Sequence, residues 1–311
     1  MDTLLNNQRT VILILVGITL LYFLPGVISP RDFWVEDEAR YAEILREVFS
    51  DGHLLVMHLN GHPYPDKPPF YFWLAALVSS VFGGVTVFNY MVVTWLTTLG
   101  AVISTYLLGN KLFGSKEALL GTLILMSSLL FLAGAGIVRM DMMLAFFVTL
   151  SLYFFWRAFQ GDGRRFYSYF WLATGFSVLT KGPLGLAFPM LTALIFIVYQ
   201  KSWIKLKPLF LNIGFLLFFP LGIGWLIAAW FAGYQEFVNN IIFQQVLERA
   251  TDSFIHKQPF YFYIMLLPVL FLPWSAYLPR AIYKLFYSPE KSVFAYLFIW
   301  FLSSLLLISL I

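Results

Sequence analysis

The sequence predicts an all-α polytopic membrane protein that forms one transmembrane domain over residues 1–311. Hydrophobic residues make up 60% of the chain and charged residues only 12%, with a mean hydropathy of +0.79. In soluble domains, about a quarter of the residues are charged. Apolar runs of about 20 residues, long enough to cross a bilayer as a helix, recur along the whole chain. The short alternating segments of a β-barrel are absent.

Nine apolar segments are predicted to span the membrane. The first run is not followed by a small-residue cleavage site, so we expect a retained helix rather than a signal peptide. We also expect Pro268, Pro273 and Pro279 to kink the eighth helix. The predicted spans are 10–29, 86–108, 117–136, 140–158, 166–181, 183–200, 208–232, 260–283 and 292–311.

The distribution of charge predicts that the N-terminus is cytoplasmic. With that orientation, the inner segments hold 12 of the 20 Lys and Arg residues and 4 of the 16 acidic residues, a net charge of +8. The outer segments hold 8 basic and 12 acidic residues, a net charge of −4. This asymmetry follows the positive-inside rule. The inner segments are 1–9, 109–117, 157–165, 201–207 and 280–291.

The first outer segment, residues 30–85, is predicted to be a structured loop with two interfacial helices. One is Asp37–Phe49, whose apolar residues recur at helical spacing. The other is Phe70–Phe82, which is short for a span and is rich in aromatic residues that suit the headgroup zone. The alternative is that Phe70–Phe82 crosses the membrane, which would put the later Lys- and Arg-rich loops outside. Two further outer loops are predicted at 136–140 and 233–259.

Five short motifs carry most of the chemistry: Asp37–Glu43, Tyr64–Pro69, Arg139–Asp141, Thr180–Gly182 and His256–Phe260. Together they resemble the GT-C class of polyprenyl-phosphate-dependent glycosyltransferases. Within that class the chain looks most like the aminoarabinose transferases that modify lipid A, relatives of the protein O-mannosyltransferase superfamily. The resemblance covers nearly the whole chain and stops short of the family's C-terminal part. We therefore expect a small version of a larger architecture or a truncated chain.

The resemblance implies an enzyme of the bacterial inner membrane with its active site on the periplasmic side. Such an enzyme moves a sugar from a polyprenyl-phosphate donor to a lipid A, glycan or protein acceptor. The leaving lipid phosphate is a stable anion, so the site needs cations more than a strong general acid. A membrane-anchored donor explains why no G-x-G-x-x-G motif or P-loop is found. Membrane lipids are expected partners, and nucleic acid is not.

By resemblance, Asp37 is the catalytic carboxylate of the first outer loop. Asp141 matches the family's second outer-loop acid, and Glu38 is a third candidate for catalysis. Each residue also has a structural interpretation. Asp37 and Glu38 can simply be first-turn acids that the helix dipole stabilises. Asp141 can form an interface ion pair with its neighbour.

By resemblance, Lys67 contacts the phosphate of the donor. Arg40, Tyr64, Lys181 and Arg139 are the other candidates for binding this phosphate. The structural alternative for the lysines is that each long side chain extends to the membrane surface. The alternative for Arg40 is an ion pair with a neighbouring acid.

No cofactor is certain from the sequence, but a divalent metal is one expectation. Asp66 and His256 are candidate ligands from two distant loops, and two ligands alone make a weak site. The family usually has Glu at the position of Asp66, which keeps the charge but changes its reach. A hydrogen-bonded interfacial role for His256 is the alternative. The chain has no cysteine, so thiolate ligands are excluded.

Two other classes of function stay open at this point. One is a transporter or flippase of lipid-linked sugars, and the other is a non-catalytic, truncated membrane homologue. A transporter needs ionisable groups near the middle of the membrane. Here those groups collect at one predicted surface, which favours chemistry at the outer leaflet.

Overall fold

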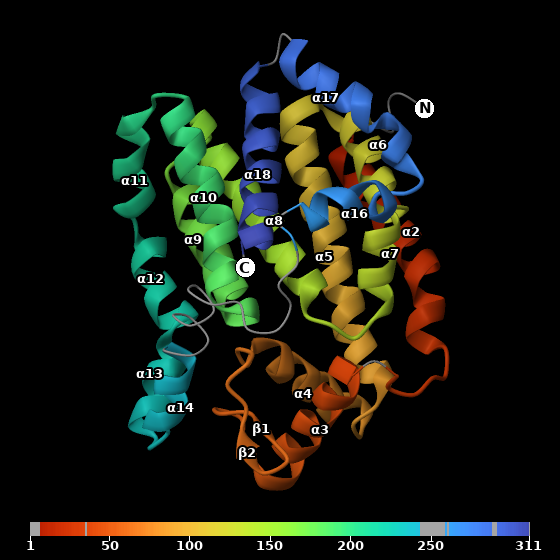
Figure 1. Cartoon of the computed structure of the whole chain (residues 1–311), viewed down its shortest axis with the longest axis vertical. Coiled ribbons are helices and arrows are strands. Elements are labelled where there is room, and N and C mark those ends of the chain that lie inside the picture. The colour runs from red at the N-terminus through yellow and green to blue at the C-terminus, as the bar shows by residue number, and fades with distance from the viewer. Residues whose placement is uncertain (1–6, 35, 243–258, 260, 288–290, 311) are drawn as a thin grey trace.

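The structure is a computed structural model, and it describes residues 7–34, 36–242, 259, 261–287 and 291–310. Long helices form a bundle, and a small layer of shorter elements lies across one end of it (Figure 1). The described chain begins at the opposite end of the bundle (Figure 1). The outer layer consists of α3 (Glu36–Asp51), β1 (His58–Leu59), β2 (His62–Pro63) and α4 (Phe70–Phe82).

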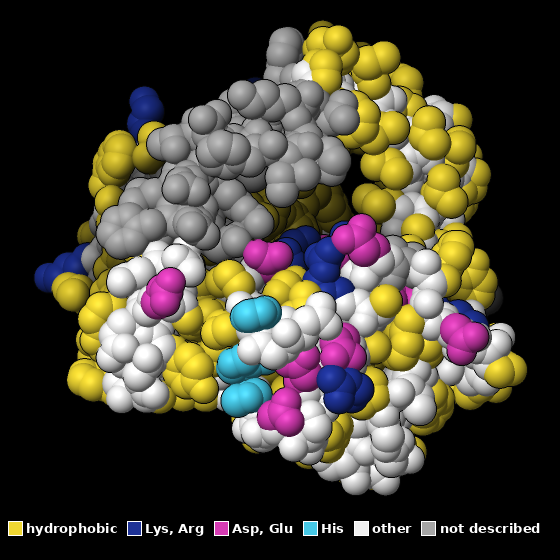
Figure 2. Space-filling model, turned by 60° about the horizontal axis from the view of Figure 1, so that its bottom comes forward, with side chains coloured by type: hydrophobic (Ala, Val, Ile, Leu, Met, Phe, Trp, Pro, Cys, Tyr) yellow, Lys and Arg dark blue, Asp and Glu magenta, His cyan; other side chains and the backbone are white. Residues whose placement is uncertain are grey.

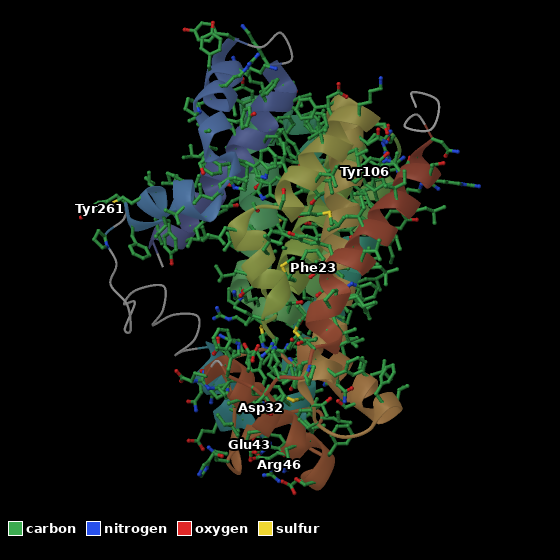
Figure 3. All side chains as sticks on the ribbon, turned by 90° about the vertical axis from the view of Figure 1, so that its right-hand side faces the viewer. Phe23, Asp32, Glu43, Arg46, Tyr106 and Tyr261 are labelled. Carbon is green, nitrogen blue, oxygen red and sulfur yellow. The ribbon has the colours of Figure 1, made fainter. Side chains whose placement is uncertain are left out.

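The bundle and its connections contain the remaining elements. Figure 3 shows Phe23 and Tyr106 along the bundle, whereas Asp32, Glu43 and Arg46 lie in the outer layer. The first bundle elements are α2 (Gln8–Ile28), α5 (Val87–Phe113), α6 (Ser115–Met126), α7 (Leu129–Gly136), α8 (Asp141–Gln160), α9 (Arg165–Lys181) and α10 (Pro183–Tyr199). They are followed by η1 (Trp203–Lys205), α11 (Leu206–Phe210), α12 (Ile213–Gly222), α13 (Gly224–Phe231), α14 (Gln235–Asn240), α16 (Phe262–Leu270), η3 (Trp274–Tyr277), α17 (Leu278–Tyr287) and α18 (Lys291–Leu310).

Within the residues that the structure describes, four helices are long and apolar enough to cross a membrane by themselves: α2, α5, α8 and α18. Three bent pairs pass the same test together, which gives up to seven spans by length and composition. Helices α9 and α10 have only 17 residues each. The prediction of an all-α protein with several membrane-spanning helices is therefore confirmed, while the count of nine stays a prediction.

The predicted eighth span is broken by a sharp turn. Its two halves, Phe262–Leu270 and Trp274–Lys284, meet at an angle of 110°. Pro268 lies inside α16, and Pro273 immediately precedes η3. Proline lacks the backbone N–H that continues a helix and collides with the preceding turn. The predicted kink is confirmed, and it is large enough to turn α17 away from the direction of α16.

Helix α3 forms where the sequence predicted an amphipathic helix. Its first turn holds Glu36, Asp37 and Glu38, which the positive end of the helix dipole stabilises. Its apolar face buries residues of the predicted stripe, including Tyr41 and Ile44, against α4 and α5. This packing fixes the position of the first turn of α3 and its three carboxylates.

A short hairpin between α3 and α4 was not predicted. Its strands β1 and β2 pair antiparallel, with Leu59 opposite His62. Asn60 and Gly61 between them have φ values of 53° and 78°. Asn-Gly is the preferred pair for a two-residue turn that needs positive φ at both positions, so this dipeptide was a usable sequence signal.

Small residues let the bundle helices approach closely, as is common in membrane proteins. A Cβ atom at Gly185 of α10 would lie 2.2 Å from the backbone oxygen of Ser177 in α9. A Cβ atom at Gly214 of α12 would lie 2.3 Å from the Cα atom of Ser168, also in α9. Helix α9 therefore packs closely against both α10 and α12. This packing fixes the position of Lys181 at the end of α9.

Candidate active site

Charged side chains from four separate segments meet where the outer layer contacts the bundle. The segments are the first turn of α3, the connection before α4, residues 137–140 and the end of α9. Figure 2 shows acidic and basic side chains gathered beside a hollow on this face of the molecule. The sequence placed candidate residues in each of these segments.

Asp37 is held between two guanidinium groups. Arg139 Nη2 donates to Asp37 Oδ2 at 2.7 Å, and Arg40 Nη1 lies 3.5 Å from Asp37 Oδ1. Arg40 also forms an ion pair with Glu36 one turn earlier. The side chain of Asp37 is partly exposed, with 24% of its surface accessible to solvent.

Asp141 lies beside Asp37 and is also surrounded by cations. Lys181 Nζ donates to Asp141 Oδ1, and Arg139 Nε lies 3.7 Å from Asp141 Oδ2. Lys67 is near enough for its charge to act on Asp141. Arg139 therefore contacts both carboxylates, and the expected Arg139–Asp141 pair is the longer of its two contacts.

Tyr64 lies beside Arg40 in this cluster, and only 5% of its surface is exposed. Its backbone N–H donates to the carbonyl oxygen of Met57 at 2.8 Å, which ties it to the hairpin region. Burial, reinforced by the charge of Asp66, raises the pKa of the Tyr64 hydroxyl to about 12, although the nearby Arg40 opposes this shift. The hydroxyl is near Arg40 but makes no well-formed hydrogen bond with the described residues. At neutral pH this buried hydroxyl stays protonated.

Glu38 lies outside the cluster, although it follows Asp37 directly. Its side chain is fully buried, and Arg31 donates to it twice, at 2.7 and 2.8 Å. Burial alone would raise the pKa of Glu38, but the hydrogen bonds from Arg31 and from the backbone N–H groups of Val138 and Trp34 hold that pKa below its ordinary value. The sequence did not identify Arg31 as a partner of Glu38.

The candidate metal ligands can be placed only in part. His256 lies outside the described residues, while Asp66 lies near Tyr64. Among residues that the structure describes, no three His, Cys, Asp or Glu side chains are grouped to hold a metal. His53 and His58 stack with ring centroids 3.8 Å apart, and the Nδ1 of His58 lies 2.9 Å from the carbonyl oxygen of Val56.

The cluster combines four cations with three aspartates, and Glu36 forms a further ion pair with Arg40 at its edge. Ion pairs between exposed or partly exposed groups contribute only about 0–1 kcal/mol each to stability. The fold therefore has little need of them. Arranged donors and cations of this kind suit the stabilisation of an anion that develops during a reaction. The cations are Arg40, Lys67, Arg139 and Lys181, and the aspartates are Asp37, Asp66 and Asp141.

An apolar cavity of about 700 Å³ begins next to this cluster. Its lining includes Pro68, which follows Lys67, and Gly182 and Pro183, which follow Lys181. The remaining walls come from α9, α10, α12, α13 and α14 and are almost wholly hydrophobic. A cationic mouth that leads into an apolar cavity can hold an amphiphile with an anionic head.

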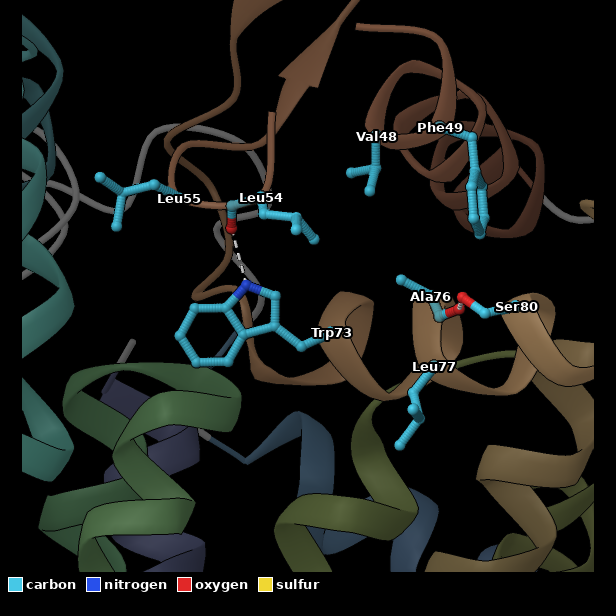
Figure 4. Close-up of a pocket in the computed structure, with 8 residues that line it drawn as sticks. All are labelled: Val48, Phe49, Leu54, Leu55, Trp73, Ala76, Leu77 and Ser80. Carbon is cyan, nitrogen blue, oxygen red and sulfur yellow. Dashed lines mark hydrogen bonds between the residues drawn. The ribbon is translucent and has the colours of Figure 1, made fainter. Parts of the chain in front are cut away.

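A second hollow, of about 600 Å³, lies between α3 and α4 (Figure 4). Trp73 Nε1 donates to the carbonyl oxygen of Leu54 at 2.7 Å across one end of it. None of the described residues that line this hollow is ionisable. The charged cluster therefore adjoins the apolar cavity beside α9 and α10, and it is not part of the hollow between α3 and α4. The lining residues are Val48, Phe49, Leu54, Leu55, Trp73, Ala76, Leu77 and Ser80.

Residues 66–227 match a family model described as dolichyl-phosphate-mannose-protein mannosyltransferase. Undecaprenyl phosphate-alpha-4-amino-4-deoxy-L-arabinose arabinosyl transferases of Pseudomonas paraeruginosa and Pseudomonas aeruginosa are 31% and 30% identical to the chain. Both matches cover 98% of this chain and 56% of the relative, so the chain spans about half the length of the curated relatives it matches.

The crystal structure of ArnT from Cupriavidus metallidurans bound to undecaprenyl phosphate has a similar fold. The TM-score is 0.87 at 23% identity, with 96% of this chain and 55% of the other covered. The apo structure of the same protein gives a TM-score of 0.81.

Proposed function

Because the chain belongs to the dolichyl-phosphate-mannose-protein mannosyltransferase family, whose model matches more than half of its residues, we propose that it is a membrane glycosyltransferase with a polyprenyl-phosphate-linked donor. The donor sugar we propose is 4-amino-4-deoxy-L-arabinose, the sugar in the names of the relatives. The acceptor we propose is lipid A, with glycans and proteins as the alternatives to be tested.

The observation that carries this proposal is the contact between the charged cluster and the apolar cavity. The residues that directly follow Lys67 and Lys181 line the cavity. An isoprenoid chain would lie in the cavity with its phosphate at the lysines. That placement would set the sugar beside Asp37 and Asp141.

The residues present supply what the transfer needs. The bond between the sugar's anomeric carbon and the phosphate oxygen breaks, and its electron pair leaves with the lipid phosphate. Lys67, Lys181, Arg139 and Arg40 stabilise the negative charge of that leaving group. An acceptor oxygen forms the new bond to the anomeric carbon.

The role of Asp37 depends on the acceptor oxygen. A hydroxyl acceptor must lose its proton, and Asp37 is the partly exposed carboxylate that can accept it. A lipid A phosphate is already ionised, so Asp37 would then orient the acceptor and stabilise positive charge that develops on the sugar. In both cases the carboxylate charge is required.

Replacing Asp37 by Asn tests the proposal. Purified wild-type protein is expected to transfer sugar from the polyprenyl-phosphate donor, and Asp37→Asn is expected to abolish transfer, a loss of about 10²-fold or more. Asp51→Asn, the same change at the far end of α3, serves as the control and should keep full activity. Thermal unfolding in detergent would show that both variants are folded.

Two results would contradict this function. Turnover at the wild-type rate in Asp37→Asn would remove Asp37 from the mechanism. Movement of the donor across vesicles without transfer would favour a flippase. Mass spectrometry of lipid A, surface glycans and secreted proteins from a deletion strain would identify the acceptor.

We also propose that the cluster faces the periplasm of a bacterial inner membrane. The excess of Lys and Arg in the predicted inner segments supports this orientation. The donor and the lipid acceptor would then both be reached from the outer leaflet.

A divalent metal held by Asp66 and His256 stays a prediction. Two side chains supply only half of a tetrahedral ligand set, so the proposed chemistry uses no metal. The metal prediction is tested by incubating the protein with a chelator and then assaying transfer. Loss of activity that a divalent cation restores would support a metal, and unchanged activity would contradict it.

A further inference from the structure

The hydrogen bonds of Glu38 indicate that its role differs from that of Asp37. Glu38 Oε1 accepts from Arg31 Nη2 and from the Val138 N–H, both at 2.8 Å. Glu38 Oε2 accepts from Arg31 Nη1 at 2.7 Å and from the Trp34 N–H at 3.3 Å. A carboxylate has about four acceptor sites. All of these are occupied, so no lone pair of Glu38 is left for a substrate.

The same contacts join two parts of the site that are far apart in sequence. The bond from Val138 to Glu38 connects residues 100 positions apart. Arg31 extends this link, because its Nη2 also lies 3.5 Å from the carbonyl oxygen of Gly136 at the end of α7. One end of the link is thus the first turn of α3, and the other is the connection that carries Arg139.

The backbone of that connection determines where Arg139 points. The chain is extended at Ile137, bends at Ile137 and Val138, and turns at Met140 into α8. Val138 and Met140 are buried, at 0% and 1% exposure. The Arg139 side chain between them is 47% exposed, and it reaches Asp37 at 2.7 Å.

We propose that Arg31 and Glu38 form a positioning pair that holds the connection 137–140 in register with α3 and so sets Arg139 against Asp37. The proposal rests on the proposed function for its effect on the reaction. Glu38 is then a positioning residue that touches neither donor nor acceptor. Removal of one partner of a buried ion pair leaves the other charge uncompensated, which is strongly destabilising.

Hydrogen exchange tests the pair without any assay of activity. Glu38→Gln is expected to speed deuterium uptake in the peptide that covers 137–140 by about tenfold. The matched control is Glu43→Gln, which breaks the ion pair with Arg46 on the exposed side of the same helix. The control should leave uptake at 137–140 unchanged.

A second variant covers the case in which Glu38→Gln does not fold. The double replacement Arg31→Met with Glu38→Met removes both charges together, which buried pairs often tolerate. It also removes the acceptor of the Val138 N–H, so faster uptake at 137–140 is again expected. Unchanged uptake in the folded variants would overturn the proposal.

Transfer kinetics test whether Glu38 acts through Arg139. Glu38→Gln should lower the transfer rate about tenfold in the wild-type background, and much less when Arg139 is already Lys, because the two changes remove one shared contact. If the double variant loses activity by the product of the two single losses, the two residues act independently, and the coupling is overturned. If the wild-type protein transfers no sugar, the proposed function fails, and the exchange experiment alone decides the positioning role.

Discussion

At the scale of single residues, the cations of the site already have anionic partners within the protein. Lys181 is paired with Asp141, and Arg139 is paired with Asp37. Asp141 also stands at the first position of α8, where the helix dipole favours a carboxylate. These pairs hold long, flexible side chains in place before a ligand arrives, which lowers the entropy cost of binding a phosphate.

Lys67 gives a prediction at this scale. Lys67→Met removes a cation near Asp141 and keeps a side chain of similar length. Hydrogen bonds to charged groups contribute about 1.5–3 kcal/mol, so kcat/KM for the donor should fall by about 10- to 100-fold. Initial rates at varied donor concentration measure this.

The control for Lys67 is Lys116→Met, a change at the opposite end of the molecule, which should leave kcat/KM unchanged. A Lys67→Met variant with the wild-type dependence on donor concentration would mean that this lysine does not bind the donor. It would then support the alternative of a lysine that extends to the membrane surface.

The sequence identified the residues of the cluster but not all of their partners. Asp37, Arg139, Asp141 and Lys181 were all candidates, and the structure brings them together. Arg31 was missed because it contacts Glu38 through a bend in the chain rather than at helical spacing. Such contacts depend on tertiary geometry, which neither composition nor periodicity reveals.

At the scale of elements, the helix contacts at α9 depend on the absence of a side chain. Gly185 packs against the backbone of Ser177, which cannot move aside as a flexible side chain can. Lys181 lies between these two positions, where α9 ends and α10 follows. The position of this lysine therefore depends on how closely α9 and α10 pack.

Gly185→Ala is expected to destabilise the protein. Its Cβ would lie 2.2 Å from a backbone oxygen, and overpacking of this kind costs about 1–3 kcal/mol or more. The midpoint of thermal unfolding in detergent measures the effect. Gly121→Ala in α6 is the matched control, because nothing lies within 4 Å of a Cβ there.

Equal midpoints for Gly185→Ala and Gly121→Ala would contradict the close packing of α9 on α10. Transfer activity adds a second measurement. A shift of α10 also moves the end of α9, so Gly185→Ala should lose more activity than the control does.

Element boundaries were predictable to different degrees. Helices α3 and α4 were expected from their patterns of apolar residues, and both are present. The hairpin β1–β2 was missed because its strands have two residues each, too few for a periodic pattern. The turn between α16 and α17 was expected from its prolines, whereas the bends between α6 and α7 and between α11 and α12 were not, because hydropathy does not record the packing on which they depend.

At the scale of the whole molecule, the orientation depends on whether α4 crosses the membrane. The helix has 13 residues, about 20 Å of helix, against a hydrocarbon core of about 30 Å. It lies in the outer layer and packs against α3, α5 and α9. Both its length and its packing favour an interfacial position.

Single cysteines can test this orientation because the natural chain has none. A membrane-impermeant maleimide should label Ser50→Cys in α3 in intact cells. It should label Lys116→Cys in α6 only after the membrane is permeabilised. Labelling of Lys116→Cys in intact cells would mean that α4 spans the membrane and that the later loops are reversed.

The pairing of Lys181 with Asp141 has a consequence for the order of events. In the proposed reaction, the donor phosphate would compete with Asp141 for Lys181, so arrival of the donor would loosen this ion pair. A carboxylate released in this way becomes available only when a sugar is already beside it. Without the donor these charges stay paired, so an acceptor of the proposed reaction that arrives alone would meet neutralised groups.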